Sequence, residues 1–169
     1  MAFGMYAASV PVYQRQLTAI SKVLDKASAW ATAKKVDEAV LVGTRMIPDM
    51  LPFSRQVMIA CRFAEESVAR LAGAEVPKAP EATEKNLGDL KARIAAVLAG
   101  IAAFKPEQID GSEGREVVLT IAGNPLKLTG AQYLTHFALP NFYFHCTTTH
   151  AILRQAGVEI GKRDFIGGL

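Results

Sequence analysis

The chain has 169 residues, a length that suits one domain with a sizeable hydrophobic core. Half of its residues are hydrophobic, and the net charge is only +3 with no run of lysines or arginines, which excludes a nucleic-acid-binding footprint. The mean hydropathy of +0.18 is high for a protein of this size. It predicts that some apolar surface is buried against a second copy, in a homodimer.

Three features favour a cytoplasmic location. The N-terminus lacks a basic segment and a long apolar run, so it is not expected to act as a signal peptide. The longest weakly polar run, residues 94–104, is too short to span a bilayer. Cys61 and Cys146 form no spacing motif and lie in apolar helical contexts, so we predict buried thiols in a reducing compartment.

The first third of the chain predicts one long and one short helix. Ser9 is the expected N-cap, and the long helix should run to about Thr32. Its inward stripe has the 3-4 spacing of a helix bundle and consists of Val10, Tyr13, Leu17, Ile20, Leu24 and Ala27. A short helix over residues 36–42 should end at Gly43, and two prolines in residues 46–52 predict a turn.

Two more long helices are expected in the middle of the chain. One should run from about residue 51 to 72 and end at Gly73. Residues 74–83 are polar and contain prolines, and this linker is long enough to cross the end of a bundle. The next helix should cover residues 84–103, with Phe104 completing its apolar stripe and Pro106 ending it.

A small β-hairpin is predicted before the last helix. In residues 116–128 the apolar side chains alternate, and the expected turn is Gly123-Asn124. Four amphipathic helix-length segments and one hairpin predict an all-α four-helix bundle, with residues 1–169 as a single domain.

The last helix, over residues 129–157, contains all three histidines. Thr129 and Gln132 have the spacing of a capping box at its start. Pro140 is expected to kink the helix or make it restart, with Asn141 as the new N-cap.

The glycine-rich tail follows Gly157, the expected helix stop. Ile160 and Phe165 are expected to anchor this tail. Residues 157–163 have some likeness to a phosphate loop, but their spacing is wrong and they follow a helix rather than a strand, so we reject that function.

The second half of the last helix has an inward stripe with 3-4 spacing. Its members are Phe142, His145, Thr149, Ile152 and Ala156. A histidine and a threonine thus stand where a core would favour leucine. We expect a polar pocket around His145, with Gln56 on the second long helix and Tyr13 on the first as inward partners. Tyr143 is expected at the mouth of the bundle, and Thr149 could either line the pocket or bond back to a carbonyl one turn earlier.

A metal site is a weaker hypothesis. His145 and His150 are five residues apart, about 140° around a helix, so they diverge, and the direction of His136 is open. Gln56 and Asp49 could contribute oxygen atoms, but glutamine is a poor zinc ligand. A buried, hydrogen-bonded His145 is therefore favoured over a metal ligand. A catalytic pair of Cys146 and His145 is disfavoured, because adjacent helical side chains do not face each other. Cys146 is therefore interpreted as a structural residue.

Several segments together resemble a known family. They are LPNFYFHCTTTHAILRQAGVEIGKRDFIG (residues 139–167), SVPVYQRQL (9–17), MIPDMLPFSRQV (46–57) and the hairpin followed by Gln132-Tyr133-Leu134. The chain resembles a bacterial family of domains of unknown function that is allied to the DinB-like superfamily of four-helix bundles. The resemblance covers nearly the whole chain and implies an up-down-down-up arrangement of the helices.

In that superfamily three histidines typically bind a divalent metal, and several members use it in thiol-dependent transfer. By resemblance, His145 matches the first histidine of an HxxxH pair, Thr149 stands at the second, and Gln56 stands near the third position. The resemblance therefore implies a degraded metal site. Two hypotheses follow: a ligand-binding bundle without a cofactor, or a divergent transferase or hydrolase that uses a divalent metal such as zinc or nickel.

Overall fold

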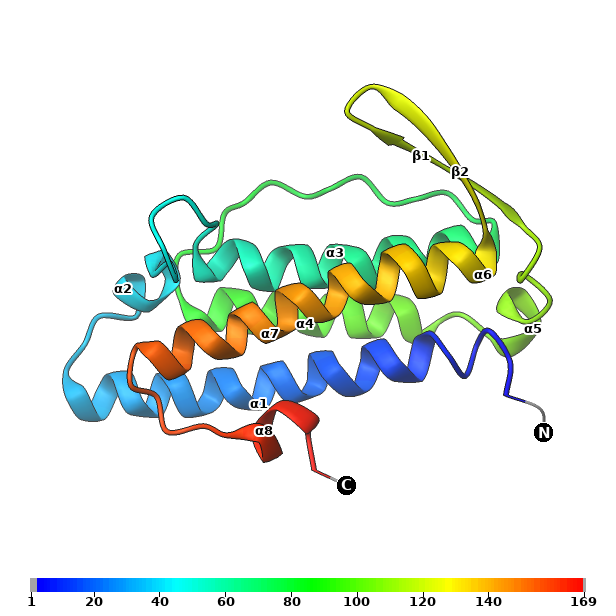
Figure 1. Ribbon diagram of the computed structural model, residues 1–169. Helices are drawn as coiled ribbons and strands as arrows, with labels where there is room; N and C mark the ends of the chain where they lie inside the picture. Colours follow the sequence, from blue (N-terminus) through cyan, green and yellow to red (C-terminus); the bar gives the residue numbers. More distant parts are fainter. Residues whose placement is uncertain (1–2, 169) are drawn as a thin grey trace.

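The structure, a computed structural model, describes residues 3–168 and is built on four long helices. They lie side by side along one axis (Figure 1) and are α1 (Val10–Lys34), α3 (Phe53–Ala72), α4 (Leu87–Ala102) and α7 (Leu139–Gln155). The chain runs one way along α1 and α7 and the opposite way along α3 and α4. The predicted up-down-down-up four-helix bundle is confirmed.

The parallel pair α3 and α4 depends on a long connection. Gly73 ends α3 in the left-handed conformation, and residues 74–86 run back along the bundle to the start of α4 (Figure 1). Twenty helical residues span about 30 Å. Thirteen extended residues reach roughly 40 Å, which is enough to cover that length.

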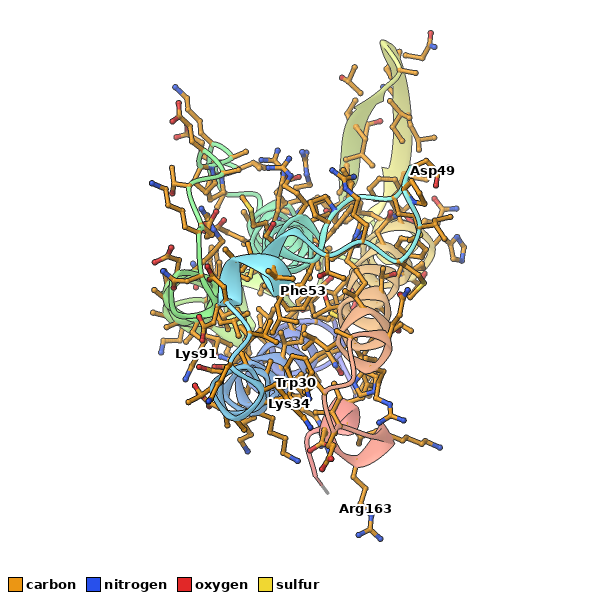
Figure 2. All side chains as sticks on the ribbon, turned by 90° about the vertical axis from the view of Figure 1, so that its left-hand side faces the viewer. Trp30, Lys34, Asp49, Phe53, Lys91 and Arg163 are labelled. Carbon is orange, nitrogen blue, oxygen red and sulfur yellow. The ribbon has the colours of Figure 1, made fainter. Side chains whose placement is uncertain are left out.

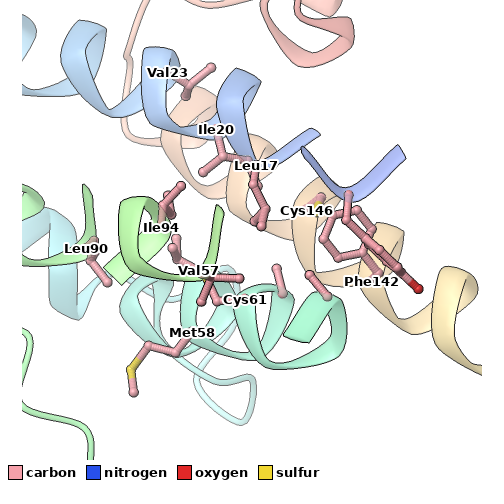
Figure 3. Close-up of a cluster of buried hydrophobic side chains, with 14 of the residues drawn as sticks. Leu17, Ile20, Val23, Val57, Met58, Cys61, Leu90, Ile94, Phe142 and Cys146 are labelled. Atoms are coloured by element: carbon pink, nitrogen blue, oxygen red, sulfur yellow. The ribbon is translucent and has the colours of Figure 1, made fainter. Parts of the chain in front are cut away.

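The core lies where the four stripes meet. Its side chains come from all four long helices (Figure 3) and include Leu17, Ile20, Val57, Cys61, Ile94, Phe142 and Cys146. The 3-4 spacing read from the sequence therefore identifies the buried faces.

The starts of the helices differ in detail from the predictions. α1 begins after Ser9 as expected, but the Ser9 hydroxyl does not cap the helix and instead donates back to the carbonyl of Met5 at 2.6 Å. The short helix α2 (Glu38–Gly43) is capped by Asp37, whose carboxylate accepts from the Ala39 N–H. α3 starts at Phe53, two residues later than expected.

The third long helix is shorter than predicted at its N-terminal end. α4 starts at Leu87 rather than residue 84, because the Asn86 side chain accepts from the Asp89 N–H and so caps the helix there. α4 ends at Ala102, and Pro106 does not end it. Pro106 instead begins a further short helix, α5 (Pro106–Ile109), at a first-turn position that proline favours.

The hairpin forms as predicted, but its turn is one residue earlier. β1 (Glu116–Ile121) pairs antiparallel with β2 (Asn124–Thr129), and the last pair is Ile121 with Asn124. The two turn residues are therefore Ala122 and Gly123, which both have positive φ (49° and 82°), as a type I′ turn requires. The hairpin projects away from the bundle (Figure 1).

The last long helix does not break at Pro140. It begins with α6 (Gly130–Gln132), where the predicted capping box of Thr129 and Gln132 is present, and continues through a π-helical segment, η1 (Tyr133–Ala138), into α7. Proline lacks an N–H and its ring clashes with the carbonyl four residues earlier in a regular helix. The wider π turn just before Pro140 accommodates both effects. Asn141 is not an N-cap, since its Nδ2 donates to the carbonyl of Phe137 at 2.7 Å.

The tail folds back onto α1. Gly157 ends α7 with a φ of 97°, as expected. Ile160 is buried, and Phe165 packs against the core from a short unpredicted helix, α8 (Lys162–Ile166). Gln16 on α1 donates to the carbonyl of Phe165 at 3.0 Å. Within residues 3–168, no helix is both long and apolar enough to cross a bilayer.

Candidate functional site

The polar contact predicted between α7 and α3 is present. The His145 Nδ1 and Gln56 Oε1 atoms are 2.7 Å apart. Gln56 donates its amide N–H to the carbonyl of Leu51 at 3.1 Å, so its oxygen must face the imidazole. This orientation assigns the proton to Nδ1 of His145, which donates to Gln56.

The second nitrogen of His145, Nε2, consequently keeps its lone pair. The ring is half-buried, and burial lowers the pKa of His145 below its ordinary value, which favours the neutral imidazole at pH 7. Phe63 stacks on the ring at 6.0 Å between centroids, and Phe144 meets it edge-on at 5.2 Å. His145 is thus a fixed hydrogen-bond acceptor in an aromatic setting.

Thr149 does not join this pair. It is 1% exposed and lines a small cavity between α1 and α7 with Gln16 and Cys146. Its Oγ1 has no hydrogen-bond partner among the described residues, whereas the neighbouring Thr148 bonds back to the carbonyl of Phe144. Thr149 thus lines a different cavity from the pocket expected around His145, and among the described residues its Oγ1 makes no bond back to a carbonyl one turn earlier.

The other two histidines lie away from His145. His150 points toward α8, where it meets Phe165 edge-on at 5.7 Å between centroids. It thus diverges from His145, as the five-residue spacing predicts. His136, whose direction was open, is exposed on η1.

The two candidate tyrosines do not bond to the His145–Gln56 pair either. Tyr13 is fully buried, with its ring edge-on to Phe142 at 4.8 Å. Burial is the main cause that raises the pKa of Tyr13, and the nearby Ser67 hydroxyl offsets part of this rise. Within residues 3–168, Tyr13 Oη has no hydrogen-bond partner closer than 3.5 Å. Tyr143 is 38% exposed on the outer side of α7.

Both cysteines are buried free thiols, as predicted. Burial raises the pKa of Cys61 to about 12 and raises the pKa of Cys146 well above its ordinary value. Both side chains are therefore protonated at neutral pH, and neither is suited to act as a thiolate nucleophile.

An open groove on the outer face of α7 was not predicted. It has a volume of about 460 Å³, and its lining consists of Met46, Tyr143, Phe144, Thr147, Thr148 and Ala151. Phe144 is 56% exposed. The signal available in the sequence was the pair of adjacent aromatic residues 143 and 144, since two neighbouring helical residues cannot both face the core.

The donor set around His145 fits a divalent metal poorly. Gln56 is already engaged with the imidazole, and Thr149 faces the cavity on the α1 side. Asp49, considered as an inward oxygen donor, is instead exposed at the periphery of the molecule (Figure 2). Among the described residues, no three histidine, cysteine, aspartate or glutamate side chains come together. A single imidazole falls short of the three protein ligands of a catalytic zinc site.

The comparisons with known proteins agree with the fold. The sequence profile of the family described as Domain of unknown function (DUF1993) matches residues 5–166. The chain is also similar to a DinB family member protein from Shewanella denitrificans, which is known from a crystal structure. The two sequences are 36% identical and the two structures have a TM-score of 0.86, over 97% of this chain and 92% of that chain. No curated protein matches. The chain belongs to the DUF1993 family, which is allied to the DinB-like four-helix bundles.

Proposed function

We propose that this protein binds a small, mostly apolar molecule in the groove on the outer face of α7, with His145, which lies against the groove-lining Phe144, supplying a polar contact. The groove carries the proposal. Its volume of about 460 Å³ lies within the usual range of small-molecule sites, roughly 300–1,000 Å³. Its lining is dominated by Phe144, Tyr143, Met46 and Ala151.

Phe144 connects the groove to His145. Its ring lines the groove and also touches the imidazole edge-on. Because Nδ1 of His145 is occupied by Gln56, Nε2 is the atom that would meet a ligand. A neutral Nε2 accepts a hydrogen bond, so the preferred ligand carries an N–H or O–H donor on an aromatic or aliphatic body.

An isosteric pair of probes tests this function. Indole has an N–H donor, and benzofuran has the same shape without one. In titrations followed by NMR of the ¹⁵N-labelled protein, we expect indole to bind about fivefold more tightly, since one net hydrogen bond is worth about 1 kcal/mol. In His145→Leu the two affinities should become equal, while thermal unfolding confirms that the variant folds.

The groove itself is tested by a filling variant and its control. Ala151→Trp should abolish binding of both probes, whereas Ala33→Trp, at an exposed position of α1, should leave binding unchanged. Equal affinity for indole and benzofuran in the unchanged protein would remove the role proposed for His145. NMR chemical-shift changes that are the same in Ala151→Trp as in the unchanged protein would show that the ligand binds outside the groove.

The alternative function is a metal-dependent transferase or hydrolase. One observation favours it: His145 donates its Nδ1–H to an oxygen, as metal-binding histidines commonly do. The donor set argues against it, so we expect no stoichiometric zinc or nickel. Elemental analysis of protein purified without a polyhistidine tag should give far less than one metal per chain. About one metal per chain, lost in His145→Ala, would contradict this expectation.

We also propose that the protein is a cytoplasmic homodimer. Buried free thiols suit a reducing compartment. The hairpin has two unpaired strand edges, and Val118, Ile121 and Leu126 on it are exposed. Such an edge favours pairing with a second copy.

We expect light scattering at micromolar concentration to give about twice the chain mass of 18.2 kDa. Val118→Lys should lower that mass to the monomer value, because the charge disfavours burial of the hairpin. Val40→Lys, at another exposed valine, is the control. A clean monomer mass for the unchanged protein would refute the dimer.

A further inference from the structure

The connection between α3 and α4 is fixed to the bundle at its C-terminal end by a partly buried ion pair. Glu84 and Arg93 form this pair, and their side chains are 5% and 16% exposed. Arg93 also donates from Nη2 to the carbonyl of Glu81 at 3.1 Å. The Arg93 guanidinium is therefore held in one orientation, while its Nη1 has no hydrogen-bond partner among the residues that the structure describes and remains available as a donor.

Two further arginines lie beside Arg93. Arg55 and Arg62 are seven residues apart on α3, which places them on one face of that helix. All three arginines line a partly open cavity between α3, α4 and the connection, together with Met58, Ile59, Ala79 and Pro80. Its volume is about 70 Å³, several times the roughly 10–15 Å³ that one water needs.

The three guanidinium groups have more donors than the carboxylates nearby use. Arg62 pairs with Glu66 on its own helix, and Glu66 also pairs with Arg70 at 3.6 Å. Arg55 forms no ion pair with any side chain that the structure describes. Each guanidinium carries five N–H donors, so most of those around the cavity have no protein acceptor.

We propose that this cavity binds a small oxyanion, either inorganic phosphate or the phosphoryl group of a phosphate monoester. Arginine is the side chain best suited to this task, because its planar fork matches phosphate oxygens. The cavity has room for one such group, with the rest of a monoester extending past Pro80 into solvent. This site lies on α3 and α4, away from the α7 groove, and does not depend on the function proposed above.

The test is a titration with inorganic phosphate, followed through the arginine Nε–Hε signals of the ¹⁵N-labelled protein at constant ionic strength. We expect saturable shifts of the Arg55, Arg62 and Arg93 signals. Arg55→Gln should weaken binding at least tenfold. Arg55 is exposed and forms no ion pair with a described side chain, so we expect this variant to fold as the unchanged protein does. Arg163→Gln, on α8 where Arg163 projects into solvent (Figure 2), should bind as the unchanged protein does.

Parallel titrations with phenyl phosphate and with sodium chloride separate the possible outcomes. Tighter binding of phenyl phosphate than of phosphate identifies a monoester site, and equal binding identifies a site for the free ion. Equal shifts with chloride at matched ionic strength, shifts that do not saturate, or equal weakening by Arg163→Gln would each overturn the proposal.

Discussion

Replacing Phe142 by alanine should lower the free energy of unfolding by about 3–5 kcal/mol. Phe142 is 0% exposed, and its ring lies edge-on to Tyr13 in the centre of the bundle. Alanine would leave a cavity there that close-packed neighbours on other helices fill only in part. Urea denaturation followed by circular dichroism measures the loss.

The control for Phe142 is two residues further along the same helix. Phe144→Ala removes an identical side chain from the outer face of α7 and should change the free energy of unfolding by no more than about 0.5 kcal/mol. Similar losses for the two variants would mean that the inward face of α7 has been assigned wrongly.

A glycine at the start of the last helix should be equally sensitive. In Gly130→Ala the added Cβ would lie 2.0 Å from the carbonyl oxygen of Ser112, a backbone atom that cannot rotate away. The backbone must shift in one segment or both, and we expect a loss of about 3 kcal/mol in the free energy of unfolding.

Gly100 provides the matched comparison. It lies in the last turn of α4, and an added Cβ would meet nothing within 4 Å. Gly100→Ala should therefore raise the free energy of unfolding by about 0.5–1 kcal/mol, because alanine loses less conformational freedom on folding. Both variants are measured by the same urea denaturation. A neutral Gly130→Ala would show that the Ser112 loop is free to move.

The sequence was informative about the bundle because helix faces are set by periodicity. Stripes such as Val10 to Ala27 are long, and a single misread residue does not change the face that they predict. Boundaries depend on one or two side chains and were less certain. The turn that precedes α1 brings the carbonyls of Met5 and Tyr6 within reach of the Ser9 hydroxyl, which donates to them instead of capping α1.

The site was predictable only in part for a similar reason. The stripe containing His145 and the position of Gln56 were sufficient to predict their contact across two helices. The stripe does not say which side of the buried face each member leans toward. Thr149 and Tyr13 therefore lie in other parts of the core, and the groove beside Tyr143 is formed with Met46, a residue remote in the sequence.

The π-helical segment before Pro140 corrects the phase of the last helix. Leu134, Ala138, Phe142 and Cys146 are all buried, although each is four residues from the next. In a regular helix three such steps would rotate the last side chain about 120° away from the first. One residue accommodated in a π turn offsets about 100° of that rotation. Deleting a single residue between Leu134 and Ala138 would consequently let the chain form an unbroken α-helix in which Leu134 and Cys146, then eleven residues apart, still lie within about 20° of one face. The carbonyl four residues before the proline would then meet its ring, a clash that the π turn relieves.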